Sequence, residues 1–167
     1  MNWSRWFSHL FATRAALRRT FSPVVLGAIE AAIARSEQQH RGEIRFAIES
    51  SLEPHAIWAG KTPRQRALEV FAALGVWDTD ENNGVLIYVL LADRDVEIVA
   101  DRGYNLRVTS DQWTDVCHAM ERHYATGGHG AGSVEGVQAV GEIIATHFPP
   151  VPGGRNADEL PNRPAIL

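Results

Sequence analysis

The sequence is short of cysteine and of long apolar runs. Cys117 is the single cysteine in 167 residues, so no disulfide can form within the chain, and a lone thiol is typical of a reducing compartment. The longest apolar run, Val85 to Ala92, has eight residues, against the roughly 20 that a membrane-spanning helix needs. Near the N-terminus, His9, Thr13 and Arg14 interrupt every apolar stretch, which argues against a signal peptide. We therefore expect a cytoplasmic protein.

Acidic residues are absent from the first 29 positions, which hold four arginines and several aromatic residues. In the rest of the chain the other 12 of the 16 basic residues stand against all 20 acidic residues, a net charge of −8. An acidic body is not typical of a nucleic-acid-binding domain, so no nucleic-acid partner is expected. The length, the apolar content of 45% and the charged content of 22% favour one folded domain over bulk disorder. The sequence thus predicts a mildly acidic domain with a short basic arm, residues 1–21.

The apolar residues of this arm follow helical spacing, which predicts an N-terminal amphipathic helix. The residues that we assign to its binding surface, aromatic, aliphatic or basic, are Trp3, Arg5, Trp6, Phe7, Leu10, Phe11, Arg14 and Arg18. Such a helix suits three situations. It can dock on its own domain or on a dimer mate, lie in a membrane interface with its guanidinium groups on anionic lipid, or bind another protein. The sequence leaves all three open.

Residues 22–148 alternate between helical and strand patterns. Helices are predicted after the capping serine at Ser22, after the capping boxes that begin at Thr62 and Thr109, and after the glycine-rich turn 127–132. Strands are predicted at 43–49, 85–91 and 96–101, the last two as a hairpin, with a loop at 50–61 and a loose tail at 149–167. A helical crossover combined with a hairpin predicts an α/β fold, a layered sandwich with a mixed β-sheet flanked by helices.

Seven short segments occur in a characteristic order: a helix end, an acidic turn, an apolar strand, an Asp-Arg turn, a second strand, Gly-Tyr and Thr-x-Asp. Here they are Phe71 to Gly75, Asp80 to Gly84, Val85 to Leu91, Asp93-Arg94, Val96 to Ala100, Gly103-Tyr104 and Thr109 to Asp111. Over roughly residues 22–148 this order resembles the TPM domain family, also called the TPM phosphatase family. The family includes a thylakoid lumen protein linked to photosystem II repair and many bacterial membrane-associated proteins.

The resemblance implies an α/β sandwich, binding of divalent cations and, in some members, acid phosphatase activity. It places metal ligands at Asp101, before Gly-Tyr, and at Asp111, at a helix start, with Asp80 and Glu81 of the acidic turn beside them. Calcium or magnesium is the expected cation, because carboxylates favour hard ions. The family often shows Gly-Tyr-Gly-Leu-Glu, whereas this chain has Arg107 in place of the glutamate.

Each of these acids also suits a purely structural role. A carboxylate in the first turn of a helix is stabilised by the helix dipole, and an acidic, asparagine-rich stretch commonly makes a turn. The family's usual export signal or anchor was not found in this chain, and we expect the basic arm to replace it.

No group of residues predicts catalysis. Cys117 lies in the middle of a helix on an apolar stripe, where a cysteine usually packs, and the histidines lack a metal-ligand spacing. The leading hypothesis is therefore a non-catalytic accessory domain of the TPM type, peripheral at the inner membrane, which acts at or near its cytoplasmic face through a protein partner. The alternative hypothesis is a metal-dependent, acid phosphatase-like hydrolase.

Overall fold

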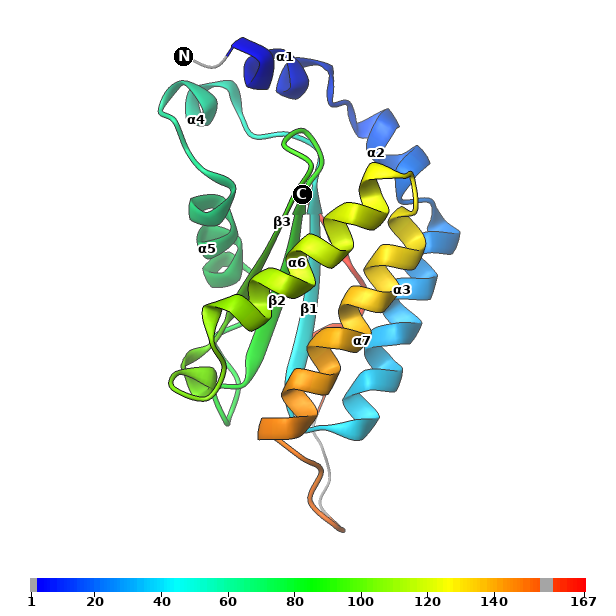
Figure 1. Cartoon of the computed structure of the whole chain (residues 1–167), viewed down its shortest axis with the longest axis vertical. Coiled ribbons are helices and arrows are strands. Elements are labelled where there is room, and N and C mark those ends of the chain that lie inside the picture. Colours follow the sequence, from blue (N-terminus) through cyan, green and yellow to red (C-terminus); the bar gives the residue numbers. More distant parts are fainter. Residues whose placement is uncertain (1–2, 154–157) are drawn as a thin grey trace.

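A computed structural model describes residues 3–153 and 158–167 and has a mixed four-stranded sheet with helices on both faces (Figure 1). The strands are β1 (Glu43–Glu49), β2 (Gly84–Leu90), β3 (Asp95–Ala100) and β4 (Ala165–Ile166). The α-helices are α1 (Trp3–Phe11), α2 (Arg14–Thr20), α3 (Pro23–Ser36), α4 (Pro54–Trp58), α5 (Pro63–Ala73), α6 (Ser110–Ala125) and α7 (His129–His147). Two short 3-10 helices are η1 (Glu37–Gln39) and η2 (Arg102–Tyr104).

The strand order is β3-β2-β1-β4. β1 and β2 are parallel, with Glu43 opposite Gly84, and the crossover between them contains α4 and α5. β2 and β3 form the predicted antiparallel hairpin, with Val85 opposite Ala100. The predicted α/β sandwich with a mixed sheet is therefore confirmed.

The two faces of the sheet have separate apolar cores. Ile44, Phe46 and Ile48 of β1 point to the layer of α3, α6 and α7, where the larger core lies. Ala47, between them in sequence, points to the smaller core under α4 and α5. All seven residues of β1 are buried, because side chains alternate between faces and both faces are covered.

Three of the four predicted helix starts are present, and the fourth differs because α7 begins at His129, inside the predicted glycine-rich turn 127–132. Ser22 accepts a hydrogen bond from the backbone amide of Val25 at the start of α3. Thr62 and Thr109 each form a complete capping box, which begins α5 and α6. Within the described ranges, no helix is both long enough and apolar enough to cross a bilayer.

Three segments differ from the expectation. The arm contains two helices, because Thr13 ends the first stripe and caps α2 by accepting from the amide of Ala16. The predicted loop at 50–61 contains the short helix α4, which Pro54 begins. The tail is not loose in its last ten residues: β4 pairs with β1, and Leu160 is buried in the smaller core. Backbone pairing and an apolar anchor hold this segment despite Pro161 and Pro164, and the pairing covers the edge of β1 that would otherwise be open.

Candidate functional site

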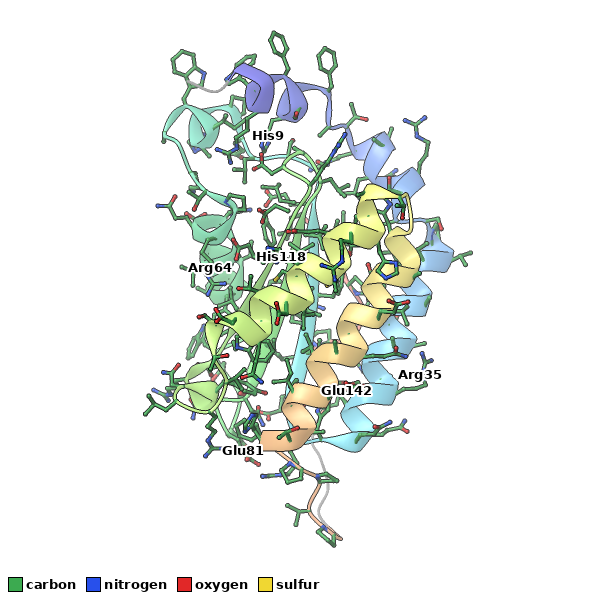
Figure 2. All side chains as sticks on the ribbon, viewed as in Figure 1. His9, Arg35, Arg64, Glu81, His118 and Glu142 are labelled. Carbon is green, nitrogen blue, oxygen red and sulfur yellow. The ribbon has the colours of Figure 1, made fainter. Side chains whose placement is uncertain are left out.

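The four predicted metal ligands lie on the segments around one edge of the sheet. Asp80 and Glu81 precede β2, Asp101 follows β3, and Asp111 lies in the first turn of α6. This edge is also where β1 begins, since Glu43 pairs with Gly84. Figure 2 shows Glu81 at the end of the molecule opposite His9.

These four acids have separate local environments. Glu81 forms an ion pair with Arg41, and Asp101 Oδ1 accepts a hydrogen bond from the amide of Arg102 at 2.7 Å, which caps η2. The other oxygen of Asp101 is buried, and no partner for it is found in the described structure. The side chains of Asp80 and Asp111 are exposed. The four acids thus lie around one end of the strands, as expected, and their cation-binding role stays a prediction.

A different set of acids comes together at the same edge. Within residues 3–153 and 158–167, the one group of three potential metal ligands with atoms within 4.8 Å of one another is Glu37, Glu43 and Asp158. Glu37 begins η1, Glu43 begins β1, and Asp158 belongs to the C-terminal segment, by which we mean residues 158–167. The four predicted acids are not part of it.

Glu37 and Glu43 lie in a low-dielectric environment. Glu37 Oε1 accepts from the amide of Ile44 at 3.0 Å, and Glu43 Oε2 accepts from the amide of Leu160 at 3.2 Å. Burial raises the pKa of Glu37 to about 8, and the charges of Glu43 and Asp158 add to this effect against the amide hydrogen bond. Burial likewise raises the pKa of Glu43 to about 7, helped by the charges of Asp158 and Glu159.

Sequence reasoning missed these acids for a specific reason. The alternation in β1 predicted one apolar face and one solvent-facing face, which would leave Glu43 exposed. The tail was expected to be loose, so nothing in the sequence indicated that it covers this second face. The sequence did show Glu43 at the start of the strand and Glu37 six residues before it. Two acids at this spacing do not form a recognisable local motif.

The single thiol has no catalytic environment. Cys117 is buried in the larger core, as the helical stripe predicted. Burial raises its pKa to about 12, with smaller contributions from the charges of Glu97 and Glu121. The side chain is therefore a neutral thiol near pH 7, which does not favour a cysteine nucleophile.

The arm docks on its own domain. His9 is buried, accepts at Nδ1 from the amide of Leu52 at 3.0 Å, and lies with Nε2 3.1 Å from Asp93 Oδ1. Because an amide can only donate, the ring proton of a neutral His9 is on Nε2 and points to Asp93. Arg5 contacts the same carboxylate, and Leu17 is buried in the larger core.

The outward side of the arm remains exposed. Phe7 and Phe11 of α1 are 50% and 73% exposed, and Arg14 and Arg18 are exposed on α2. Trp6 is half-buried. The side chains of Trp3 and Leu10, also assigned to this surface, lie outside the part that the structure describes.

The TPM domain model matches residues 17–143. The chain belongs to the TPM domain family. A solved structure of the BA42 protein from the psychrophilic bacterium Bizionia argentinensis is 32% identical, with a TM-score of 0.75, over 87% of this chain and 94% of BA42. The family resemblance read from the sequence is thus confirmed, and the match begins within α2, after most of the arm.

Two more distant structures share the fold of this TPM domain protein. The N-terminal domain of a P. gingivalis protein has 19% identity and a TM-score of 0.58, over 76% of this chain and 78% of that domain. The N-terminal domain of cg2496 from Corynebacterium glutamicum has 15% identity and a TM-score of 0.54, over 74% of this chain and 73% of that domain. No curated protein sequence matches this chain.

Proposed function

We propose that this TPM domain protein is a non-catalytic binding domain that attaches to an anionic membrane surface, at the cytoplasmic face, through its N-terminal arm. The observation that supports this proposal is the division of α1 into two sides. Arg5 and His9 fix one side to the domain, while Phe7 and Phe11 on the other side stay in solvent. A helix that needed only to cover its own domain would not require two exposed phenylalanines.

The exposed aromatic residues form what we call the aromatic face: Phe7 and Phe11 of α1 with Trp58 of α4. All three are at least half exposed. α1 and α4 lie at the same end of the molecule (Figure 1), and Arg5 of α1 donates to the carbonyl of Lys61, just after α4, at 2.8 Å. Aromatic rings favour the headgroup boundary of a bilayer, where an apolar ring can be partly buried.

The arm is positively charged, which favours binding to anionic lipid over binding to a neutral or basic surface. Arg5 is paired with Asp93, which leaves Arg14, Arg18 and Arg19 as exposed cations, and the first 29 residues contain no acid. Each arginine close to an anionic bilayer contributes about 1 kcal/mol, so three of them with the aromatic face give reversible peripheral binding. A protein partner for the rest of the domain stays a prediction.

The test is vesicle flotation with the full chain. We expect it to float with vesicles rich in phosphatidylglycerol, less so in high salt, and little with pure phosphatidylcholine. The double variant F7S/F11S should lose most of this binding, because both side chains are exposed and the fold should tolerate the change. Removal of residues 1–21 is a poorer test, since Leu17 and Phe21 are core residues.

Trp77 provides a matched control. Its exposed fraction, 55%, is similar to that of Phe7. However, Trp77 precedes the acidic turn, which lies at the opposite end of the molecule. The variant W77S should float as the parent chain does. If F7S/F11S also floats unchanged, or if no vesicle binds the parent chain, the lipid assignment is wrong, and a protein becomes the occupant of the aromatic face.

The proposal that the domain is non-catalytic is tested separately. We expect no hydrolysis of p-nitrophenyl phosphate by the purified chain, with or without added Ca²⁺ or Mg²⁺, between acid and neutral pH. The buried thiol and the separate environments of the predicted acids support this expectation. Metal-dependent turnover that D101N abolishes would overturn it in favour of a phosphatase.

A further inference from the structure

The arm forms one wall of a groove at the end of the molecule that carries the aromatic face. The opposite wall comes from the end of β2, from the turn that follows it and from the end of α6. The groove has a volume of about 690 Å³, within the range of roughly 300–1,000 Å³ that is typical of ligand pockets. Segments distant in sequence therefore border a space large enough for a small ligand.

The lining of this groove is largely apolar. More than half of the residues that line it are apolar or glycine, among them Phe11 and Ala16 from the arm and Leu91 and Ala92 from the domain. Leu91 and Ala92 end the longest apolar run of the chain and are half-buried, whereas β2 before them is fully buried. The packing of the domain thus leaves the end of this run partly in water, and an apolar ligand in the groove would cover it.

A cation stands beside this apolar lining. Arg94, in the turn between β2 and β3, is exposed and lines the groove, and its guanidinium has no hydrogen bond or ion pair within the described ranges. The neighbouring Asp93 is already engaged by Arg5 and His9. The φ of Arg94 is +54°, a left-handed conformation that favours glycine or asparagine in turns. The backbone of this turn does not need an arginine, so the contribution of Arg94 lies in its charged side chain.

The other charges around the groove leave Arg94 as the place for an anion. Among the described lining residues, Glu121 is the one acid, and its Oε1 accepts from the amide of Val96 at 3.1 Å, which ties this carboxylate to β3. α2, which contributes to the wall, also carries the exposed Arg14 and Arg18. These two arginines add positive potential along the wall that the arm forms.

We propose that this groove binds one long-chain fatty acid, with its acyl chain on the apolar lining and its carboxylate on Arg94. An apolar surface next to a single unpaired cation is complementary to an amphiphile with one anionic group, and a guanidinium can bind a carboxylate through two hydrogen bonds. The volume is that of a pocket for one small ligand, which suits one acyl chain better than the two chains of a diacyl phospholipid.

A bound fatty acid contacts the arm and the domain together. The arm is already attached through Arg5 and His9 of α1 and through Leu17 of α2. An acyl chain between Ala16 on one wall and Leu91 on the other adds an apolar contact between these two attachments. Because the ligand binds only the folded arrangement, it raises the melting temperature of the chain.

The experiment titrates the delipidated full chain with cis-parinaric acid, a fatty acid whose fluorescence rises in an apolar site, in water without vesicles. We expect saturation at one probe per chain and displacement of the probe by palmitate. Affinity should rise about threefold to fourfold for each methylene added to a saturated acid and then level off, because only methylenes inside the groove leave water. Hexadecanol, which lacks the carboxylate, should bind more weakly than palmitate. Monomeric dihexanoyl phosphatidylglycerol should not displace the probe.

Two variants test the two parts of the site. R94G should weaken palmitate binding about tenfold and leave hexadecanol binding unchanged, and the fold should tolerate it because glycine suits a φ of +54°. A16F places a ring in the groove and should abolish the binding of both ligands. If A16F also lowers the melting temperature, R94G alone decides. R122A is the matched control, since Arg122 is an exposed arginine on α6 that does not line the groove.

The fatty-acid site is wrong if the parent chain does not bind the probe saturably, if R94G binds palmitate as the parent chain does, or if R122A loses binding equally. Displacement by the diacyl lipid as effective as that by palmitate would also overturn it. F7S separates this site from vesicle binding, because Phe7 does not line the groove. F7S should weaken flotation with vesicles and leave probe binding unchanged, so either proposal can fail without the other.

Discussion

Arg5 and Asp93 are 88 positions apart and form a two-pronged ion pair, with Nε 2.9 Å from Oδ1 and Nη2 2.8 Å from Oδ2. Asp93 lies in the turn between β2 and β3, and Arg5 lies on α1, so this pair joins the arm to the tip of the hairpin. The same carboxylate contacts His9. One aspartate thus fixes which side of α1 faces the domain, and thereby which side presents Phe7 and Phe11.

Loss of this pair should loosen the arm. R5A leaves a half-buried carboxylate with fewer donors, so we expect the free energy of unfolding to fall by about 1–3 kcal/mol. Urea denaturation measures the change, and limited proteolysis should show faster cleavage between α1 and α2. R14A removes an exposed arginine and should change the stability by less than about 0.5 kcal/mol. Equal effects of the two variants would contradict the docking role of Arg5.

The attachment of the arm should weaken in acid. Burial raises the pKa of Asp93, but the hydrogen bond of Arg5 and the charges of His9 and Arg5 outweigh it, and the net pKa is lowered. A group with a lowered folded pKa stabilises the fold above its unfolded pKa of about 3.9, and this stability is lost as the pH falls through the folded value. The stability difference between the parent chain and D93N should therefore be full at pH 6 and decline below about pH 4. Urea denaturation at several pH values tests this, and a difference that does not depend on pH would contradict it.

A buried polar network under α5 should contribute to stability. Glu49 of β1 accepts from the hydroxyl of Tyr88 at 2.7 Å and from Arg66 Nε and Nη2 at 2.8 and 3.1 Å. R66A leaves the carboxylate of Glu49 buried without its cation, so we expect a loss of about 3 kcal/mol. Y88F leaves the ion pair intact and should lose only about 1 kcal/mol. Thermal or chemical denaturation gives the order, and a larger loss in Y88F would mean that the hydroxyl dominates.

The C-terminal segment should behave as part of the domain. Leu160 is buried in the smaller core, so L160A should lower the free energy of unfolding by about 2–3 kcal/mol. V151A changes an exposed residue between α7 and this segment and should have almost no effect. Hydrogen exchange should show protection at the amides of Leu160 and Leu167, which donate to Glu43 and to the carbonyl of Ile48. A small effect of L160A would contradict this packing.

Much of the fold was predictable because its signals are local. The apolar run 85–91 indicated a strand covered on both faces, and β2 is fully buried. The capping boxes at Thr62 and Thr109 indicated the first residue of two helices, because a capping box depends only on side chains three positions apart. The break between α1 and α2 at Thr13 also depends on local residues. It was missed because the helical spacing of apolar residues continues past it to Leu17.

The sites were less predictable because their partners are distant. Glu43 is buried, and it accepts a hydrogen bond from the amide of Leu160, a residue more than a hundred positions later. Asp93 looked like an ordinary turn residue, since nothing near it indicated that Arg5 and His9 would contact it.

By itself, the sequence determined the family, the α/β sandwich and the split between a basic aromatic arm and an acidic body, since these depend on composition, periodicity and the order of local motifs. Only the tertiary structure decided which acids meet and which side of the arm is free. Both depend on burial and on contacts between segments far apart in the chain. The packing of α1 on the hairpin leaves Phe7 and Phe11 in solvent, and the packing of the C-terminal segment on β1 brings Asp158 to Glu37 and Glu43.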